Sequence, residues 1–356
     1  MKRFFFLIVT VAIVAGCTTK FSVNGEYDET PIVHMLLDPN DEFHFLKLNK
    51  TFLGDGNAND FAMVADSAYF DQVDATIEEI IGGSTTRTWT LQDTIIENKE
   101  SGTFYYPEQK LYFFQADDLN EDALYRLTID IENGRHIVKG QTELVQDINI
   151  TFPNAFQQIN FAEANVPLNG YNTQSIAFST GPNAAVFKVQ LRFDYREFKP
   201  SGNENKSLLW NIGTLRIADL TTTNPSLGAN GESFYEFVAN SIQEDPDVTR
   251  RTVNGFEILV TAGSEDLNTY MLTNQPTSSL AQNKPTFSNV EGGLGIFSAR
   301  TTAAQYKEFQ YTNNPNQRGF SLNSTRELCE GQYTGSLKFC SDNTNDIAQN
   351  YSFACN

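Results

Sequence analysis

Cysteines are the residues of this chain whose chemistry is easiest to interpret. Cys17 stands alone near the start, whereas Cys329, Cys340 and Cys355 all lie close to the end. Disulfides form in exported proteins, and three cysteines leave one unpaired. The spacing favours a bond between Cys329 and Cys340, which would close a short loop containing two glycines, over the alternative pair of Cys340 and Cys355. A zinc site is not favoured, because no histidine and no close Cys-x-x-Cys pair accompanies them.

The sixteen residues before Cys17 have the parts of an export signal. Two basic residues open the segment, an apolar run from Phe4 to Val14 follows, and two small residues precede the cysteine. The run is shorter than the roughly 20 residues of a membrane-spanning helix. The quartet VAGC at 14–17 resembles the bacterial lipobox, in which the cysteine is lipidated and becomes the first residue. We therefore expect 1–16 to be a removed signal and Cys17 to carry a lipid anchor; the alternative is an ordinary signal peptide with a chance cysteine.

Two acidic loops have spacing that suits a calcium ion. DGNAND (55–60) and DDLNED (117–122) each place oxygen-bearing side chains at alternate positions, as calcium requires. Neither loop has the sixth-position glycine or the distant glutamate of an EF-hand, and Asp- and Asn-rich turns are also common in ordinary loops. Calcium is therefore the one cofactor that the sequence suggests, with the first loop preferred. Its candidate ligands are Asp55, Asn57, Asn59 and Asp60.

No pattern of residues indicates an enzyme. The chain lacks a Gly-x-Ser-x-Gly elbow, a His-Glu-x-x-His zinc helix and a phosphate-binding loop. His34 and His44 fall on two expected neighbouring strands and could approach each other, although histidines on a solvated strand face are the ordinary interpretation. Pairs of carboxylates can hydrolyse glycosides, but with 44 acidic residues no pair stands out. The sequence favours a non-catalytic protein over a hydrolase.

Composition describes a well-folded, acidic, exported protein. The chain is 40% hydrophobic and 12% aromatic, enough for sizeable cores, and its length suits two domains after the signal is removed. The formal charge of −19 becomes −21 when the two basic residues of the signal are lost. Such a surface repels the phosphates of nucleic acids and of anionic lipid headgroups. Nucleic acid is therefore excluded as a partner, and membrane contact should depend on the lipid.

The first half, 31–150, reads as an antiparallel β-sandwich. About seven short strands follow one another with regular turn signals and no long helix. ALYRLTIDI (123–131) alternates apolar and polar residues, and Asn133-Gly134 predicts a hairpin turn. EFHFLKLNKTFL (42–53) changes its apolar phase midway, which predicts either a bulge or a strand buried on both faces. Tyr125 loosely matches the tyrosine corner of immunoglobulin-like sandwiches, but a plain core tyrosine is our preferred interpretation.

The second half, 151–320, is predicted to be a second β-rich domain with one or two short helices. VFKVQLRFDYREF (186–198) alternates over its whole length and predicts a long antiparallel strand. Ser264 followed by acids and apolar residues at helical spacing predicts a short helix. NVEGGLGIF (289–297) is either a tightly packed strand or a binding loop, because glycine permits close approach. The remaining segments are a tether and a cysteine-containing C-terminal tail: 17–30 and 321–356.

Several segments resemble a large family of Bacteroidetes outer-membrane lipoproteins. They are LNKTF, GTFYYP followed by YFF, FEILVTAGSEDLNTYM and FSNVEGGLGIFSAR, together with the lipobox. The resemblance implies an N-terminal immunoglobulin-like sandwich, a β-rich second half, and residence in the outer membrane, often beside TonB-dependent transporters. It favours the cell surface, with the periplasmic face as the alternative. Two Asp-Ser/Thr-apolar triplets resemble O-glycosylation sites of these bacteria, centred on Ser67 and Thr94.

Three functions follow as hypotheses. The first is a lipid-anchored, non-catalytic binding or accessory subunit of an outer-membrane β-barrel or TonB-dependent transporter complex. The second is a lipoprotein that binds a glycan or peptide and delivers it to a transporter, since aromatic rings can stack on sugars. The third is an uncharacterised hydrolase. The aromatic candidates for the second hypothesis are Trp89, Tyr105, Tyr106, Tyr112 and Trp210.

Overall fold

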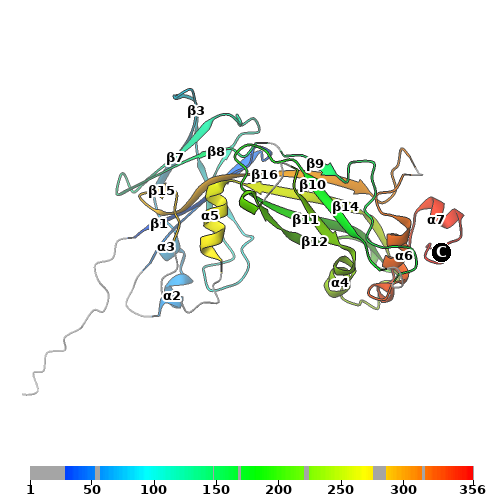
Figure 1. Cartoon of the computed structure of the whole chain (residues 1–356). Helices are drawn as coiled ribbons and strands as arrows, with labels where there is room; N and C mark the ends of the chain where they lie inside the picture. The colour runs from blue at the N-terminus through cyan, green and yellow to red at the C-terminus, as the bar shows by residue number, and fades with distance from the viewer. Residues whose placement is uncertain are drawn as a thin grey trace, which may run out of the picture.

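The chain folds mainly as β-sheet. The computed structural model describes residues 29–52, 57–146, 148–166, 170–219, 224–275, 286–314 and 317–355. Within these ranges sixteen strands form three sheets and the helices are short (Figure 1). The predicted mainly-β class with a β-sandwich and a β-rich neighbour is confirmed.

The first sandwich has the strand order of an immunoglobulin fold. Its first sheet contains β1 (Pro31–Leu37), β2 (Phe43–Lys50), β6 (Gln109–Gln115) and β5 (Gln92–Ile96). Its second sheet contains β8 (His136–Glu143), β7 (Leu124–Ile131), β3 (Val73–Ile81) and β4 (Ser84–Thr90). In immunoglobulin nomenclature these orders are A-B-E-D and G-F-C-C′. The two sheets enclose a core in which Trp89 of β4 packs on Phe114 of β6.

Tyr125 at the start of β7 forms a tyrosine corner. Its side chain is fully buried, and its hydroxyl lies 3.1 Å from the carbonyl oxygen of Asn120, a few residues upstream. This is the bond that defines the corner at the E–F turn of immunoglobulin-like domains. The hydroxyl also lies 3.0 Å from the buried carboxylate of Glu79. Our preference for a plain core tyrosine was therefore wrong.

The second half builds another two-layer core. Its large sheet contains β12 (Gly202–Arg216), β11 (Val186–Lys199), β14 (Arg250–Gly263) and β16 (Leu294–Glu308). A small sheet contains β13 (Ser226–Asn230), β10 (Thr173–Phe178) and β9 (Ile150–Phe152). The long strand predicted at 186–198 is confirmed as β11, and the apolar residues of its alternating pattern are all buried: Phe187, Val189, Leu191, Phe193 and Tyr195.

Strand β16 joins the two halves into one sheet. Its first residues, 294–299, pair in parallel with β1, and its remaining residues, 300–308, pair antiparallel with β14. The result is a continuous eight-stranded sheet in the order β12-β11-β14-β16-β1-β2-β6-β5. Just before β16, the short strand β15 (Val290–Glu291) pairs with β8 of the second sheet. Strand pairing therefore crosses the domain boundary that we placed at 150/151.

Short helices lie around the sheets. The helix predicted after Ser264 is confirmed as α5 (Glu265–Asn274), and the Ser264 hydroxyl accepts a hydrogen bond from the Leu267 amide. Figure 1 shows α5 beside the strands of the first sandwich. The other helical segments are α2 (Ala58–Ala62), α3 (Ala65–Ala68), η1 (Ile217–Asp219), α4 (Gly231–Ser241), α6 (Leu322–Glu330), η2 (Gly335–Leu337) and α7 (Thr344–Ala348).

Strand β2 has no bulge and is not buried on both faces, so both alternatives that we predicted for it are wrong. Its alternation is continuous, with His44, Leu46 and Leu48 inward and Phe43 and Phe45 outward. Its pairing with β1 and β6 is also regular. The apparent change of phase arose because a polar histidine takes an inward position while two phenylalanines stand outside.

The predicted disulfide between Cys329 and Cys340 is wrong, and the alternative pair is present. Cys340 and Cys355 are bonded, with their Cα atoms 5.0 Å apart, whereas Cys329 is a free, buried thiol on α6. The reason is local: the backbone of Ser341 bonds to both Phe353 and Cys355, which brings the last residues alongside Cys340. Residues 321–355 thus fold as a cap whose apolar side chains join the core.

Candidate functional site

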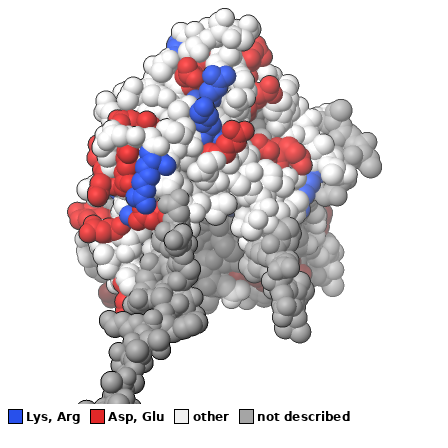
Figure 2. Space-filling view, turned by 90° about the vertical axis from the view of Figure 1, so that its left-hand side faces the viewer, with Lys and Arg blue, Asp and Glu red and all other residues white. Residues whose placement is uncertain are grey.

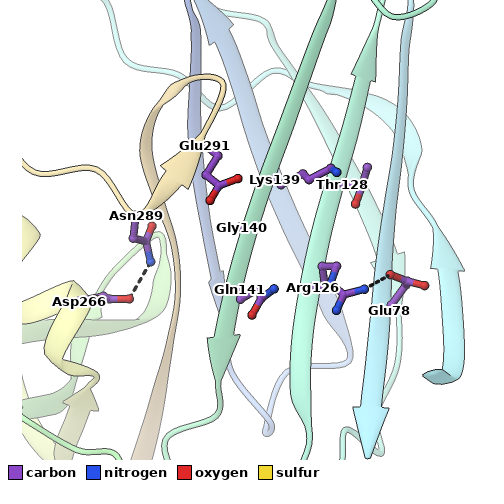
Figure 3. Close-up of a pocket in the computed structure, with 9 residues that line it drawn as sticks. All are labelled: Glu78, Arg126, Thr128, Lys139, Gly140, Gln141, Asp266, Asn289 and Glu291. Atoms are coloured by element: carbon purple, nitrogen blue, oxygen red, sulfur yellow. Dashed lines mark hydrogen bonds and ion pairs between the residues drawn. The ribbon is translucent and has the colours of Figure 1, made fainter. Parts of the chain in front are cut away.

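A polar hollow of about 660 Å³ lies on the outer face of the second sheet of the first sandwich. Figure 3 shows its lining side chains converging from strands β3, β7 and β8 on one side, and from α5 and the segment around β15 on the other. The lining residues are Glu78, Arg126, Thr128, Lys139, Gly140, Gln141, Asp266, Asn289 and Glu291.

Apart from Gly140, which is buried, the strand residues of this hollow occupy the outward positions of an alternating pattern. In β7 the residues between them, Tyr125, Leu127 and Ile129, point into the core. Register then sets the polar residues side by side, because Arg126 pairs with Glu78 on one side and Gln141 on the other. The Arg126 guanidinium lies 3.4 Å from the Glu78 carboxylate. The floor of the hollow therefore follows directly from the two-residue period of the strands.

The opposite wall is held by Asn289. Its amide nitrogen donates to the Asp266 carboxylate at 2.8 Å and to the Phe297 carbonyl at 2.7 Å, and its amide oxygen accepts from the Phe297 amide at 2.9 Å. One side chain thus ties the start of α5 to β16 and to the residues before β15. The wall is consequently a fixed structure and not a loose loop.

Two glycines explain how NVEGGLGIF fits between its neighbours. Gly292 and Gly295 have φ values of +75° and +112°, and an added Cβ would lie 2.1 Å from the Ile137 carbonyl oxygen and 1.9 Å from that of Val33. Only glycine tolerates both the left-handed backbone and the close approach. The structure therefore supports the tightly packed strand, while Asn289 and Glu291, which precede these glycines, line the hollow.

A second hollow of about 340 Å³ continues the first along β8. The two share Gln141 and Asp266, and the second is bordered by residues from both halves of the chain. We call the two hollows together the β8 groove. The additional residues that line it are Leu124, Thr142, Glu143, Asn183, Ser264 and Glu265.

The β8 groove is polar and acidic. It contains five carboxylates and two basic groups, which gives a net charge of −3. On the face drawn in Figure 2, Asp and Glu side chains are likewise abundant and the basic side chains lie close to them. The hydroxyl of Ser264, which caps α5, already hydrogen-bonds to the Ser298 hydroxyl and accepts from the Leu267 amide. The groove therefore offers hydrogen bonds and charges to a polar partner, and its lining contains no histidine or cysteine.

The two histidines on neighbouring strands do not meet. His44 is buried, with Nε2 3.0 Å from the Ala116 carbonyl and its ring stacked on Phe114. His34 points to the opposite face, where Nε2 lies 2.8 Å from the Tyr270 hydroxyl of α5. Burial lowers the pKa of both. The ordinary interpretation, a solvated face, was also wrong for His44.

The calcium candidates are engaged in local structure where they are described. Asn57 caps α2 by accepting from the Asn59 amide, and Asp60 belongs to that helix, whereas Asp55 lies outside the described residues. In the second loop, Asp118 binds Arg87 at 2.7 Å. Across the described part of the chain, no three His, Cys, Asp or Glu side chains are arranged to hold a metal. Calcium stays a prediction.

The remaining candidates are placed as follows. Cys17 lies outside the described residues, Ser67 is half-buried on α3, and Thr94 is half-buried on β5. Of the aromatic candidates, Tyr112 is buried and both tryptophans pack partly into cores, whereas Tyr106 is exposed. Among the described helices, none is both long and apolar enough to cross a membrane. Sequence reasoning missed the β8 groove, because its residues come from five separate helices and strands and from the loops beside them.

Comparison with known proteins leaves the family of this chain undefined. No protein-family model matches it, and no curated protein sequence is significantly similar. Among solved structures it has a distant similarity to the C-terminal globular domain of an oligosaccharyltransferase from Pyrococcus abyssi. That similarity covers 66% of this chain and 48% of the other, at 14% identity and a TM-score of 0.23. A similarity at this level supports no statement about function.

Proposed function

We propose that this protein is a lipid-anchored, non-catalytic binding lipoprotein of the outer membrane, and that its β8 groove binds a segment of a partner protein. The partner that we favour is a membrane β-barrel complex, as the lipobox at 14–17 and the resemblance to outer-membrane lipoproteins suggest. The observation that carries the binding role is the groove itself, which is polar, open and held between two rigid walls.

The groove suits a polypeptide segment better than a small apolar ligand. Small-molecule sites are mostly apolar with a few polar groups, whereas this lining is dominated by charged and amide side chains. With five carboxylates against two basic groups, it would attract a segment that carries lysine or arginine. Gln141 and Asn289 could in addition bond to peptide groups of the partner.

Charge reversal in the groove tests this function. The tagged chain is purified from envelopes in mild detergent as wild type, as Glu291→Lys and as Glu244→Lys, which changes an exposed glutamate that lies outside the groove. We expect a stoichiometric membrane partner with wild type and with Glu244→Lys, and its loss with Glu291→Lys at moderate salt. Surface electrostatics weaken with ionic strength, so added salt should reproduce the loss in wild type.

A second variant makes the result decisive. Gln141→Arg places a long side chain where the two hollows meet. Retention of the same partner by both Glu291→Lys and Gln141→Arg would exclude the groove as the binding site. A wild-type chain that is recovered alone, but binds a soluble peptide or glycan, would instead support the cargo-delivery alternative.

A further inference from the structure

We infer that one end of the first sandwich rests on the lipid bilayer through a cluster of exposed apolar side chains. This inference rests on the proposed lipid anchor and adds a second, protein-mediated contact to it. The residues, which we call the apolar end, are Met63, Val64, Ile95, Phe104 and Tyr106.

The five side chains are all exposed. Their exposed fractions are 43% for Met63, 47% for Val64, 63% for Ile95, 59% for Phe104 and 38% for Tyr106. Exposed apolar residues are common singly and need no explanation. These five come from only three neighbouring segments, which are the α2–α3 region, the end of β5 and the loop before β6. Their grouping therefore needs an explanation.

Contacts between the segments hold them together at one end of the sandwich. The Tyr105 amide donates to the Ala62 carbonyl at 2.8 Å, which joins the loop before β6 to α2. The rings of Tyr69 and Tyr105 meet edge to face, with centroids 6.5 Å apart. Both tyrosines line a hollow of about 220 Å³ together with Ile95. Figure 1 shows α2 and α3 next to each other at one end of the sandwich.

The described chain begins at this same end. The Glu29 carboxylate bonds to Lys50 at 2.9 Å, and the Lys50 ammonium lies 5.4 Å from the centre of the Phe70 ring. Phe70 in turn lines the hollow that contains Tyr69 and Ile95. Eleven residues lie between Cys17 and Glu29, and the twelve residue-to-residue steps that join these two positions span at most about 40 Å of extended chain. A lipid on Cys17 would therefore keep Glu29 within about 40 Å of the bilayer, and Glu29 lies on the same end of the sandwich as the apolar end.

The side chains match the interfacial zone of a bilayer. Tyrosines are enriched there because their rings are apolar at one end and polar at the other, and Tyr69, Tyr105 and Tyr106 supply three. Lys99 donates to the Tyr105 carbonyl and lies 5.9 Å from the centre of the Phe104 ring, so a positive group lies beside one of the two most exposed side chains of the apolar end.

The surrounding charges select the kind of lipid. The adjacent hollow is lined by three carboxylates and one basic group, Lys110, so it carries a net negative charge that would repel anionic headgroups. The carboxylates are those of Asp66, Asp71 and Glu108. Binding should therefore come from apolar insertion into a zwitterionic surface and change little with salt. A lipid anchor and an apolar surface are two separate membrane signals, and two signals give stable attachment. Together they would fix the orientation of the sandwich, which a single flexible tether cannot do.

Fluorescence quenching by lipid tests this contact in the lipidated protein. Phe104→Cys and the control Leu209→Cys are each labelled with an environment-sensitive dye and reconstituted in phosphatidylcholine vesicles with brominated acyl chains. Leu209 is similarly exposed, at 52%, but lies on β12 of the second half. Labelling is selective, because Cys17 would be acylated, Cys340 and Cys355 are bonded and Cys329 is buried.

We expect quenching and a blue shift of the dye at position 104 and neither at 209. If the protein floats with the vesicles but the dye at position 104 is not quenched, the lipid anchor would be supported and the contact of the apolar end with the bilayer would be refuted. A native chain that carries no lipid and does not float would refute the proposed anchor and this inference with it. In the unlipidated Cys17→Ser chain, Phe104→Ser should weaken vesicle binding roughly tenfold, with little effect of salt.

Discussion

Lys307 shows at the residue scale how the fold changes the chemistry of a side chain. It lies at the end of β16, fully buried, and its ammonium group donates to the Asn154 carbonyl at 2.6 Å. Among the described residues it has no ion-pair partner. Burial lowers its pKa to about 8. An unfolded lysine has a pKa near 10.4, so the unfolded state binds more protons between these two values and stability should rise with pH there.

We therefore expect the free energy of unfolding to increase by about 1 kcal/mol between pH 7 and pH 9. Urea titrations at both values would measure it. Lys307→Met should abolish the increase, whereas Lys188→Met, which changes an exposed lysine of β11, should keep it. Burial also raises the pKa of Cys329, which makes stability fall with pH near pH 9 and so opposes the effect of Lys307. Both variants keep Cys329, so the difference between them reports on Lys307 alone. An equal rise in both variants would show that Lys307 does not cause it.

The Glu79 network shows a second residue-scale effect, in which partners outweigh burial. Burial alone would raise the pKa of Glu79, but hydrogen bonds from Arg87, Thr86 and Tyr125 lower it to about 2. Arg87 also stacks on Trp89, 4.8 Å from the ring centre. This network joins β3, β4 and β7, so the tyrosine corner is part of the support beneath the sheet that carries the groove.

At the scale of elements, β16 holds the molecule together, and Gly295 allows it to do so. An added Cβ at Gly295 would collide with the backbone of Val33 in β1. We expect Gly295→Ala to lower the free energy of unfolding by at least about 2 kcal/mol, because both the backbone conformation and the strand contact are disturbed. Gly102→Ala is the control, since an added Cβ there meets nothing within 4 Å. Equal unfolding midpoints for the two variants would contradict this role.

Local pattern predicted some elements and missed others for physical reasons. The alternation of β7 and β11, the turn at Asn133-Gly134 and the cap of α5 are short-range features, and the structure has all of them. The pairing of β16 with β1 joins residues more than 250 positions apart and leaves no local signature. The groove was unpredictable for the same reason. The disulfide joins Cys340 to Cys355 because backbone hydrogen bonds of Ser341 bring the two together, and loop length alone could not predict those bonds.

At the scale of the whole molecule, the fold fixes the distance between the groove and Glu29, the first residue that the structure describes. Arg135, just before β8, lies 3.3 Å from Glu29. Gln141 lies six residues further along β8, which corresponds to roughly 20 Å of extended strand. If the apolar end rests on the bilayer, the groove would stand roughly 20 Å above it. That height suits contact with the loops of a membrane protein. The apolar end would then orient the sandwich on the bilayer so that the β8 groove can reach those loops.

The most direct test of the proposed function is photo-crosslinking from the groove in living cells. A photoreactive amino acid is placed at Gln141, where the two hollows meet, and in a matched strain at Glu244, an exposed residue of the second half outside the groove. Adducts are identified by mass spectrometry of the membrane fraction. We predict one dominant adduct with a membrane β-barrel protein from Gln141 and none from Glu244. Membrane-anchored protein that yields no adduct from Gln141, or the same adducts from both positions, would contradict the proposal.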